Sequence, residues 1–302
     1  VELDKGVVIE DGELVEFRKI DSGRRIRSEK VRVSERLGDP SAPKSVSLIA
    51  IHQHKIPNIF PEDVLLQSKK ASFLQNKKWD DYSHVPFVTI DPKDARDHDD
   101  ACYAKPDDDP KNIGGHLIWV AIADVAHFVR SGDAIDNEAR HRGNSTYFPD
   151  RVVPMLPDNL SGNLCSLHEG EKRACIVVKI KIDSVGNKIS HKFTRAVIQS
   201  WASLEYGEVQ EVIDKGKGKP KVLDLVNTVI KPLYDAYSCL KISRKARSPL
   251  DLNLPERKIE IDEKGIVKDV RFKERLEAHK LIEEFMILAN VCAAVTVSLI
   301  HI

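Results

Sequence analysis

The chain has 302 residues, of which 41% are hydrophobic and 31% charged, a composition that excludes a disordered chain and leaves room for about two domains. Its formal net charge is zero. The strongly basic balance of many nucleic-acid-binding proteins is therefore absent, and any contact with nucleic acid requires a local field.

The first 64 residues favour short β segments separated by turns. Residues 6–9 and 14–17 flank the turn-forming Glu10-Asp11-Gly12-Glu13 and predict a hairpin. Further β segments are predicted over residues 31–33 and 45–51, with the breakers Gly38-Asp39-Pro40 between them. We therefore place a domain boundary near residue 65.

After residue 65 the pattern is mixed α/β. Residues 116–124 form a strongly apolar segment that predicts a strand. Residues 174–182 and 189–198 predict a hairpin around the turn at 183–188. Helices are predicted over 133–142, 204–214, 221–244 and 275–298.

Five aspartates lie within ten residues, directly after the apolar residues 85–90. They are Asp91, Asp94, Asp97, Asp99 and Asp100. So many carboxylates repel one another unless cations neutralise them, and their oxygens suit hard divalent ions such as Mg²⁺, Mn²⁺ or Ca²⁺. An acidic surface turn is the alternative. Because a strand delivers the cluster and another follows it, the pattern also fits carboxylates that hold two metal ions against a phosphodiester.

The residues from Phe285 to Ile302 contain no Asp, Glu, Lys or Arg, which just reaches the length of a membrane span. The alternative is a buried helix, since apolar residues recur with helical spacing and polar residues such as Asn290 interrupt the segment. We expect a core helix and no membrane contact.

The five cysteines are far apart and form no CxxC pair, so neither a zinc ribbon nor a disulfide framework is indicated. We expect buried free thiols in the reducing cytoplasm. The cysteines are Cys102, Cys165, Cys175, Cys239 and Cys292.

Three ordered blocks together resemble a known family. Residues 89–101 read Thr-Ile-Asp-Pro-Lys-Asp-Ala-Arg-Asp-His-Asp-Asp-Ala and resemble the signature of the RNB exoribonucleases, the ribonuclease II and ribonuclease R group. A second block begins with Tyr-Phe-Pro-Asp at 147–150 and continues through Pro-Met-Leu-Pro at 154–157 to Cys-Ser-Leu at 165–167. The third is Glu-Glu-Phe-Met-Ile-Leu-Ala-Asn at 283–290. The ribonuclease R branch is closer, because it shares Asp-Ala-Arg-Asp.

The resemblance implies an α+β fold. Residues 65–302 would form a mixed α/β RNB catalytic domain, truncated at its C-terminal side. Residues 1–64 would be the C-terminal part of a β-rich cold-shock or OB-type RNA-binding domain, which binds single strands.

The implied activity is processive 3′→5′ hydrolysis of single-stranded RNA to nucleoside 5′-monophosphates by two-metal-ion catalysis, in RNA degradation and processing. Mg²⁺ is the expected cofactor, with Mn²⁺ as an alternative, and no obligate protein partner is expected. Asp91, Asp97, Asp99 and Asp100 match the family's catalytic, metal-binding aspartates. Asp91 and Asp100 are assigned mainly to metal, Asp97 and Asp99 to metal and the terminal nucleotide, and the loss of Asp99 is expected to be most damaging.

The resemblance also implies RNA-binding side chains. Tyr147 matches an aromatic residue that stacks near the 3′ end, and Tyr206 matches one that stacks against the terminal bases. Glu283 or Glu284 matches a helix carboxylate near the nucleotide channel. From the residues alone, buried core tyrosines and solvated glutamates remain open.

One departure concerns a Ser-Pro-Ile-Arg-Arg-Tyr block that completes the family's site and does not occur in these 302 residues. The chain is therefore expected to be a truncated form. The alternative function is that of a catalytically impaired RNA-binding fragment, because an arginine that stabilises the transition state would be missing.

Overall fold

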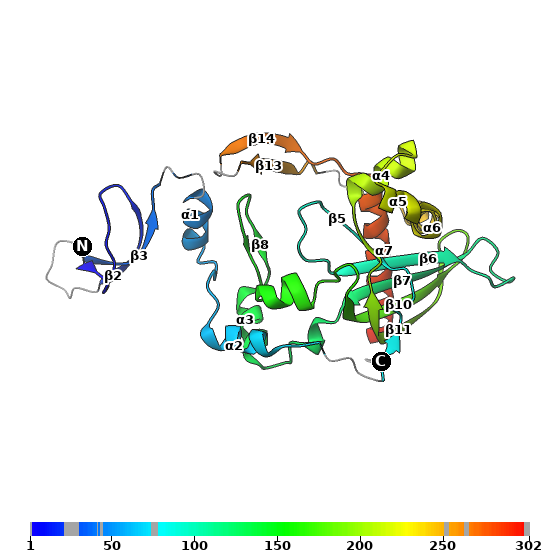
Figure 1. The fold of residues 1–302 in the computed structure, drawn as a ribbon, viewed down its shortest axis with the longest axis horizontal. Helices are drawn as coiled ribbons and strands as arrows, with labels where there is room; N and C mark the ends of the chain where they lie inside the picture. Colours follow the sequence, from blue (N-terminus) through cyan, green and yellow to red (C-terminus); the bar gives the residue numbers. More distant parts are fainter. Residues whose placement is uncertain are drawn as a thin grey trace. The chain divides into compact units, whose positions relative to one another are not determined.

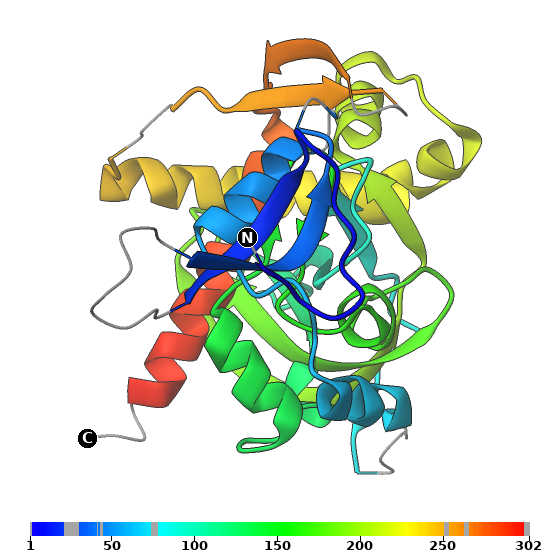
Figure 2. The same cartoon turned by 90° about the vertical axis from the view of Figure 1, so that its left-hand side faces the viewer.

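The computed structural model describes residues 2–20, 30–40, 42, 45–73, 78–250, 254–262 and 266–298, and Figures 1 and 2 show its ribbon. Contacts divide the chain into two compact units. Unit 1 comprises Val1–Pro61, Glu138–Met155 and Pro255–Lys273, and unit 2 comprises Glu62–Asn137, Leu156–Leu254 and Glu274–Ile302. The first division lies near the predicted boundary at residue 65, but two later segments also belong to unit 1. The assignment of residues 1–64 to a cold-shock or OB-type domain stays a prediction.

Unit 1 contains a three-stranded sheet in the order β1-β3-β2. Its strands are β1 (Glu2–Leu3), β2 (Leu14–Ile20) and β3 (Lys30–Gly38). Strands were correctly predicted at 14–17 and 31–33, but residues 6–9 form none, and β2 pairs antiparallel with β3 instead. Gly6 explains this difference, since its φ of 88° is incompatible with an extended strand.

The prediction of a β segment over residues 45–51 was wrong, because these residues form the helix α1 (Ser45–Gln53). Ser47 and Ile51, four residues apart, are buried, whereas Val46 and Ile49 are exposed. The buried pair therefore lies on one face of the helix, and the alternation of serine with apolar residues was misleading. The Ser45 hydroxyl also donates a hydrogen bond to the carbonyl of Asp39 at 2.8 Å, which fixes the start of the helix.

The remaining strands of unit 1 form two short hairpins. They are β8 (Thr146–Tyr147) with β9 (Val152–Val153), and β13 (Arg257–Ile261) with β14 (Val267–Phe272).

Unit 2 is built on a seven-stranded sheet in the order β12-β5-β6-β7-β10-β11-β4. The central strands are antiparallel, whereas β12 pairs parallel with β5 and β4 pairs parallel with β11. The predicted strand at 116–124 and the hairpin at 174–198 are confirmed as β7 and as β10 with β11. The strands are β4 (Asp80–Asp81), β5 (Val88–Asp91), β6 (Asp100–Pro106), β7 (His116–Ala123), β10 (Lys172–Ile182), β11 (Lys188–Gln199) and β12 (Ala202–Glu205).

Four helices of unit 2 pack against this sheet in one apolar core, to which Val120, Ile180, Leu233, Leu281 and Phe285 contribute. One helix was predicted over 221–244, but the structure divides it into α5 and α6 around a wider π-type turn at Val226–Ile230. The helices are α4 (Tyr206–Lys215), α5 (Pro220–Leu225), α6 (Lys231–Arg247) and α7 (Glu277–Ser298). Outside this core lie α2 (Glu62–Lys70), in unit 2, and α3 (Ala134–Arg142), whose residues from Glu138 on belong to unit 1.

By length and composition alone, α7 is the one helix of the described residues that could cross a membrane. Its inward side chains instead belong to the core of unit 2, among them Leu281, Phe285, Leu288 and Cys292. A core helix passes the same test of length and composition, so this packing favours the predicted core helix over a membrane span.

The five cysteines are all buried and free, as predicted.

The β10–β11 turn packs closely against α6. Gly186 in this turn has a φ of 82°, and a Cβ there would lie 2.2 Å from the carbonyl oxygen of Cys239 on α6. Only glycine allows the turn to approach the helix backbone so closely.

Candidate active site

The ends of two neighbouring strands position the acidic cluster in unit 2. Asp91 is the last residue of β5, and Asp100 is the first residue of β6. The two strands pair antiparallel, with Val88 opposite Cys102, so the loop that carries Asp97 and Asp99 turns back at this edge. The two strands therefore bring the backbones of the four predicted aspartates to one edge of the sheet.

The block Cys165-Ser166-Leu167 clamps this loop. The backbone N–H of His98 donates to the Ser166 hydroxyl at 3.0 Å, and the Leu167 N–H donates to the His98 carbonyl at 2.9 Å. Ser166 is fully buried and its hydroxyl donates to the Arg96 carbonyl at 3.3 Å. The second sequence block thus has a structural task, which is to hold the backbone of the first.

His98 is a site residue for which no role was predicted. Its Nδ1 lies 2.6 Å from Oδ2 of Asp91, and both side chains are largely buried. This hydrogen bond raises the pKa of His98, and the charges of Asp97 and Asp99 add to the effect against an opposing contribution from burial. The sequence does contain a signal for this role, since His98 is a titratable residue between two aspartates of the motif, Asp97 and Asp99.

Burial and mutual repulsion act on the aspartates themselves. Burial, followed by the charges of Asp91 and Asp99, raises the pKa of Asp100 to about 7. Burial and the charges of Asp97 and Asp91 likewise raise the pKa of Asp99. The repulsion between these carboxylates disfavours their ionised forms. A bound cation would relieve it, and an oxygen-only donor set of this kind fits hard divalent ions.

The four aspartates do not close around a single point. Within the described part of the chain, three possible ligand atoms lie within 4.8 Å of one another only at Glu16, Glu35 and His52, which belong to unit 1. The carboxylates of the cluster are therefore spread along the loop.

Tyr206 lies beside the aspartates, as the parallel pairing of β12 with β5 requires. Glu205 is the partner of Asp91, and Tyr206 follows it at the start of α4. Burial and then the charges of Asp91 and Asp100 raise the pKa of Tyr206. One face of its ring stacks on His279 of α7, with centroids 4.0 Å apart and planes at 18°.

The structure distinguishes the two candidate glutamates of α7. Glu283 is four residues after His279 and lies on the same side of the helix, with 38% of its side chain exposed. Glu284 is 3% exposed and forms ion pairs with Arg244 and, at 3.7 Å, with Arg247. Glu283 therefore lies on the His279 side of α7, where it pairs with Arg275 and, at 3.7 Å, with Arg244, whereas the buried Glu284 anchors α7 to α6.

Tyr147 lies on β8 in unit 1 and is 66% exposed. The aspartates belong to unit 2, so its assignment to the RNA site stays a prediction.

Comparison with known proteins identifies a family. The RNB domain family model matches residues 79–300. Ribonuclease R of Vibrio cholerae is 37% identical over 289 residues, which cover 94% of this chain and 34% of that protein. The chain thus spans about a third of the length of the curated relatives it matches.

Solved structures are similar as well. Mycoplasma genitalium RNase R in complex with ribose methylated single-stranded RNA has a TM-score of 0.83 at 30% identity, covering 91% of this chain and 42% of that one. The same protein in complex with double-stranded RNA has a TM-score of 0.89 at 27% identity, covering 99% and 54%. The RNB match contains all three sequence blocks and most of the chain, which therefore belongs to the RNB-domain family.

Proposed function

We propose that this chain carries the metal-binding and nucleotide-binding part of a 3′→5′ exoribonuclease. The observation that carries the proposal is the position of Tyr206, next to a loop in which the pKa values of Asp99 and Asp100 are raised. An aromatic ring beside carboxylates with raised pKa values suits binding of the end of an RNA strand, because the ring can stack on a base and the carboxylates can hold a metal ion at the phosphate.

Single-stranded RNA is the proposed substrate and nucleoside 5′-monophosphates are the proposed products. The similar RNase R structures were solved with single-stranded and with double-stranded RNA, which supports RNA as the ligand class. Base stacking tolerates any sequence, and this suits processive degradation. The five free, buried thiols suit a reducing cytoplasm, where the RNA degradation and processing are proposed to take place.

Each aspartate has a proposed task. Bound Mg²⁺, or Mn²⁺ in its place, would supply a hydroxide at neutral pH and neutralise the phosphate and the leaving oxygen. Asp91 and Asp100, fixed at strand ends, would hold the metal, while Asp97 and Asp99 would reach both the metal and the terminal nucleotide. Glu283 would contact the terminal nucleotide from α7.

The second candidate is RNA binding without turnover. The charges that act on Asp99 and Asp100 come from other aspartates and from His98, and none comes from a described lysine or arginine. A site without such a cation would hold an RNA end and stabilise the pentavalent phosphate poorly.

Release of nucleotides from end-labelled poly(A), with and without Mg²⁺, tests the proposal. Asp99→Asn should abolish release and leave RNA binding, measured in EDTA, within about twofold. Asp108→Asn is the matched control, because Asp108 is exposed at the far end of β6, where it pairs with Lys105.

Three outcomes are decisive. Mg²⁺-dependent release by the wild type and the control alone supports the exonuclease. Binding without release in every variant supports the second candidate. Normal release by Asp99→Asn would show that the catalytic assignment is wrong.

A further inference from the structure

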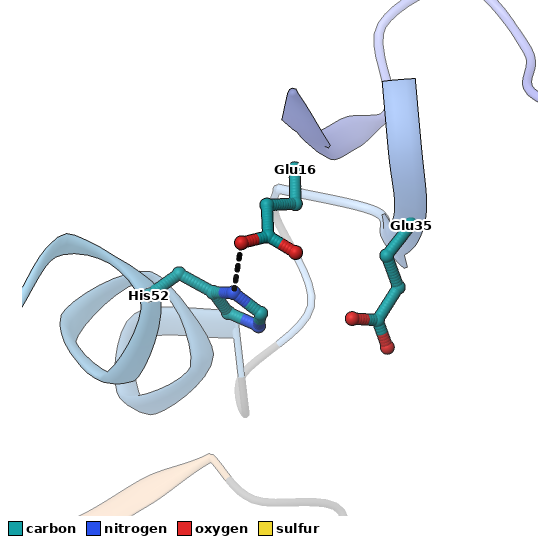
Figure 3. A group of neighbouring side chains, drawn as sticks. All are labelled: Glu16, Glu35 and His52. Carbon is teal, nitrogen blue, oxygen red and sulfur yellow. Dashed lines mark ion pairs between the residues drawn. The ribbon is translucent and has the colours of Figure 1, made fainter. Parts of the chain in front are cut away.

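Glu16, Glu35 and His52 meet in unit 1 from three different elements, β2, β3 and α1 (Figure 3). One nitrogen or oxygen from each lies within 4.8 Å of the other two. His52 is largely buried, next to Ile51 in the helix side that faces inward, and 45% of the Glu16 side chain is exposed.

The pairing of β2 with β3 places two like charges opposite each other. Glu16 and Glu35 are direct partners in this antiparallel ladder, whose register shifts on both sides of the pair, between Leu14 and Val15 and between Glu16 and Phe17. Like charges directly across a ladder are destabilising. A cation between them would convert this repulsion into attraction.

Two arginines of β3 are engaged with other acids. Arg32 of β3 forms an ion pair with Glu2 at 2.7 Å, and Arg36 pairs with Glu13. His52 Nδ1 lies 3.8 Å from Oε1 of Glu16, which is longer than the about 2.7–2.9 Å of a charge-assisted hydrogen bond. Even a protonated imidazole would bring a single charge to two carboxylates.

We propose that Glu16, Glu35 and His52 bind one divalent transition-metal ion of the Zn²⁺ type. An imidazole nitrogen with two carboxylate oxygens favours such an ion over Mg²⁺, which prefers oxygen ligands alone. Ligand atoms around a tetrahedral Zn²⁺ lie about 3.4 Å apart, given bonds of about 2.0–2.2 Å. The glutamates can close the remaining gap by rotating their side chains, and water would take the fourth position.

The ion would fasten α1 to the strands β2 and β3. This site differs from the acidic loop of unit 2 in its donor atoms and in the elements that supply them, so the inference goes beyond the proposed exonuclease and does not depend on it. The metal holds structure at this site and takes no part in phosphodiester chemistry.

Isothermal titration of the full, metal-stripped chain with ZnCl₂ tests the site. The background carries Asp99→Asn and Asp100→Asn, so that the acidic loop contributes little. His52→Ala and Glu35→Gln should each weaken the binding of one Zn²⁺ equivalent at least tenfold. His54→Ala is the matched control, because His54 follows α1 directly and is exposed.

Thermal unfolding gives a second readout. Zn²⁺ should raise the Tm of the background and of His54→Ala by several degrees and should leave the Tm of Glu35→Gln unchanged. Mg²⁺ should raise the Tm of none of these proteins. If His52→Ala fails to fold, the exposed and isosteric Glu35→Gln decides the matter. Binding within twofold of the background in Glu35→Gln, with the same Tm rise, overturns the proposal.

Discussion

The Nδ1 atom of His98 and Oδ2 of Asp91 share a hydrogen bond of 2.6 Å in the centre of the acidic loop. The raised pKa of His98 means that this contact with Asp91 favours the protonated imidazole more than water does. Metal binding at Asp91 therefore has to compete with this internal ion pair.

We predict that His98→Phe destabilises the metal-free protein by about 1.5–3 kcal/mol, the usual contribution of a hydrogen bond to a charged group. The same change should tighten Mg²⁺ binding, because Asp91 is then free. Urea unfolding in EDTA and Mg²⁺ titration measure the two effects. The exposed His141→Phe should change neither, and weaker Mg²⁺ binding by His98→Phe would show that the imidazole assists the metal.

One face of the Tyr206 ring stacks on His279, so the proposed stacking on RNA would use the other face. Tyr206→Ala should weaken the binding of short oligonucleotides by about 1–3 kcal/mol, and Tyr206→Phe should cost little because the ring remains. Fluorescence anisotropy in EDTA measures both. A Tyr206→Ala protein with a lowered Tm but unchanged affinity would instead identify a purely structural tyrosine.

Glu283 and Glu284 are adjacent in sequence but should respond differently to the same substitution. Glu284→Gln removes a buried partner of Arg244 and should lower the free energy of unfolding by about 1.5–3 kcal/mol. Glu283→Gln, in a partly exposed pair with Arg275, should leave stability nearly unchanged and alter RNA binding or turnover. Denaturation and nucleotide-release assays on both variants decide; the reverse pattern would exchange the roles.

The raised pKa of Asp100 makes the stability of the metal-free protein depend on pH. Between the ordinary value of 3.8 and about 7, the native protein holds a proton that the unfolded chain releases. Stability should therefore fall as pH rises through this range, by at most about 4 kcal/mol. His98 acts in the same direction, because its contribution is present below 6.5 and is lost as pH rises through its higher native pKa.

Unfolding in EDTA from about pH 5 to about pH 8 should show this fall, and millimolar Mg²⁺ should reduce it by favouring the ionised carboxylates. Asp100→Asn should flatten the profile, while Asp108→Asn should keep it. Glu277, whose pKa Lys241 and Lys280 lower to about 2, acts at lower pH and does not contribute in this window. A wild-type free energy of unfolding that does not change over this pH range would contradict the raised pKa of Asp100.

The sequence predicted the parts of the fold in which periodicity and burial agree. The β10–β11 hairpin and the inward side of α7, with Phe285 and Ala289, are examples. The segment 45–51 could not be assigned correctly, because alternating serines imitate a strand and the partners of Ser45 lie in the preceding turn. Local pattern competes with tertiary contacts at such places, and the contacts win.

The candidate site divides in a similar way. A motif shows which aspartates are present, but not that His98 bonds to Asp91 or that Ser166 holds the loop from 70 residues away along the chain. Neither could the choice between Glu283 and Glu284 be made, because one residue along a helix turns a side chain by about 100° and the packing of α6 decides which is buried.

The pairing of Glu205 with Asp91 fixes the distance between these two backbone positions. Neighbouring strands lie about 4.7–4.9 Å apart, a spacing that backbone hydrogen bonds set and that core substitutions do not change. The main chain therefore sets the distance between the backbones of Asp91 and Tyr206. If Asp91 binds metal and Tyr206 stacks on a base, as proposed, this fixed distance would suit nucleotide units of one size, whichever base each unit carries.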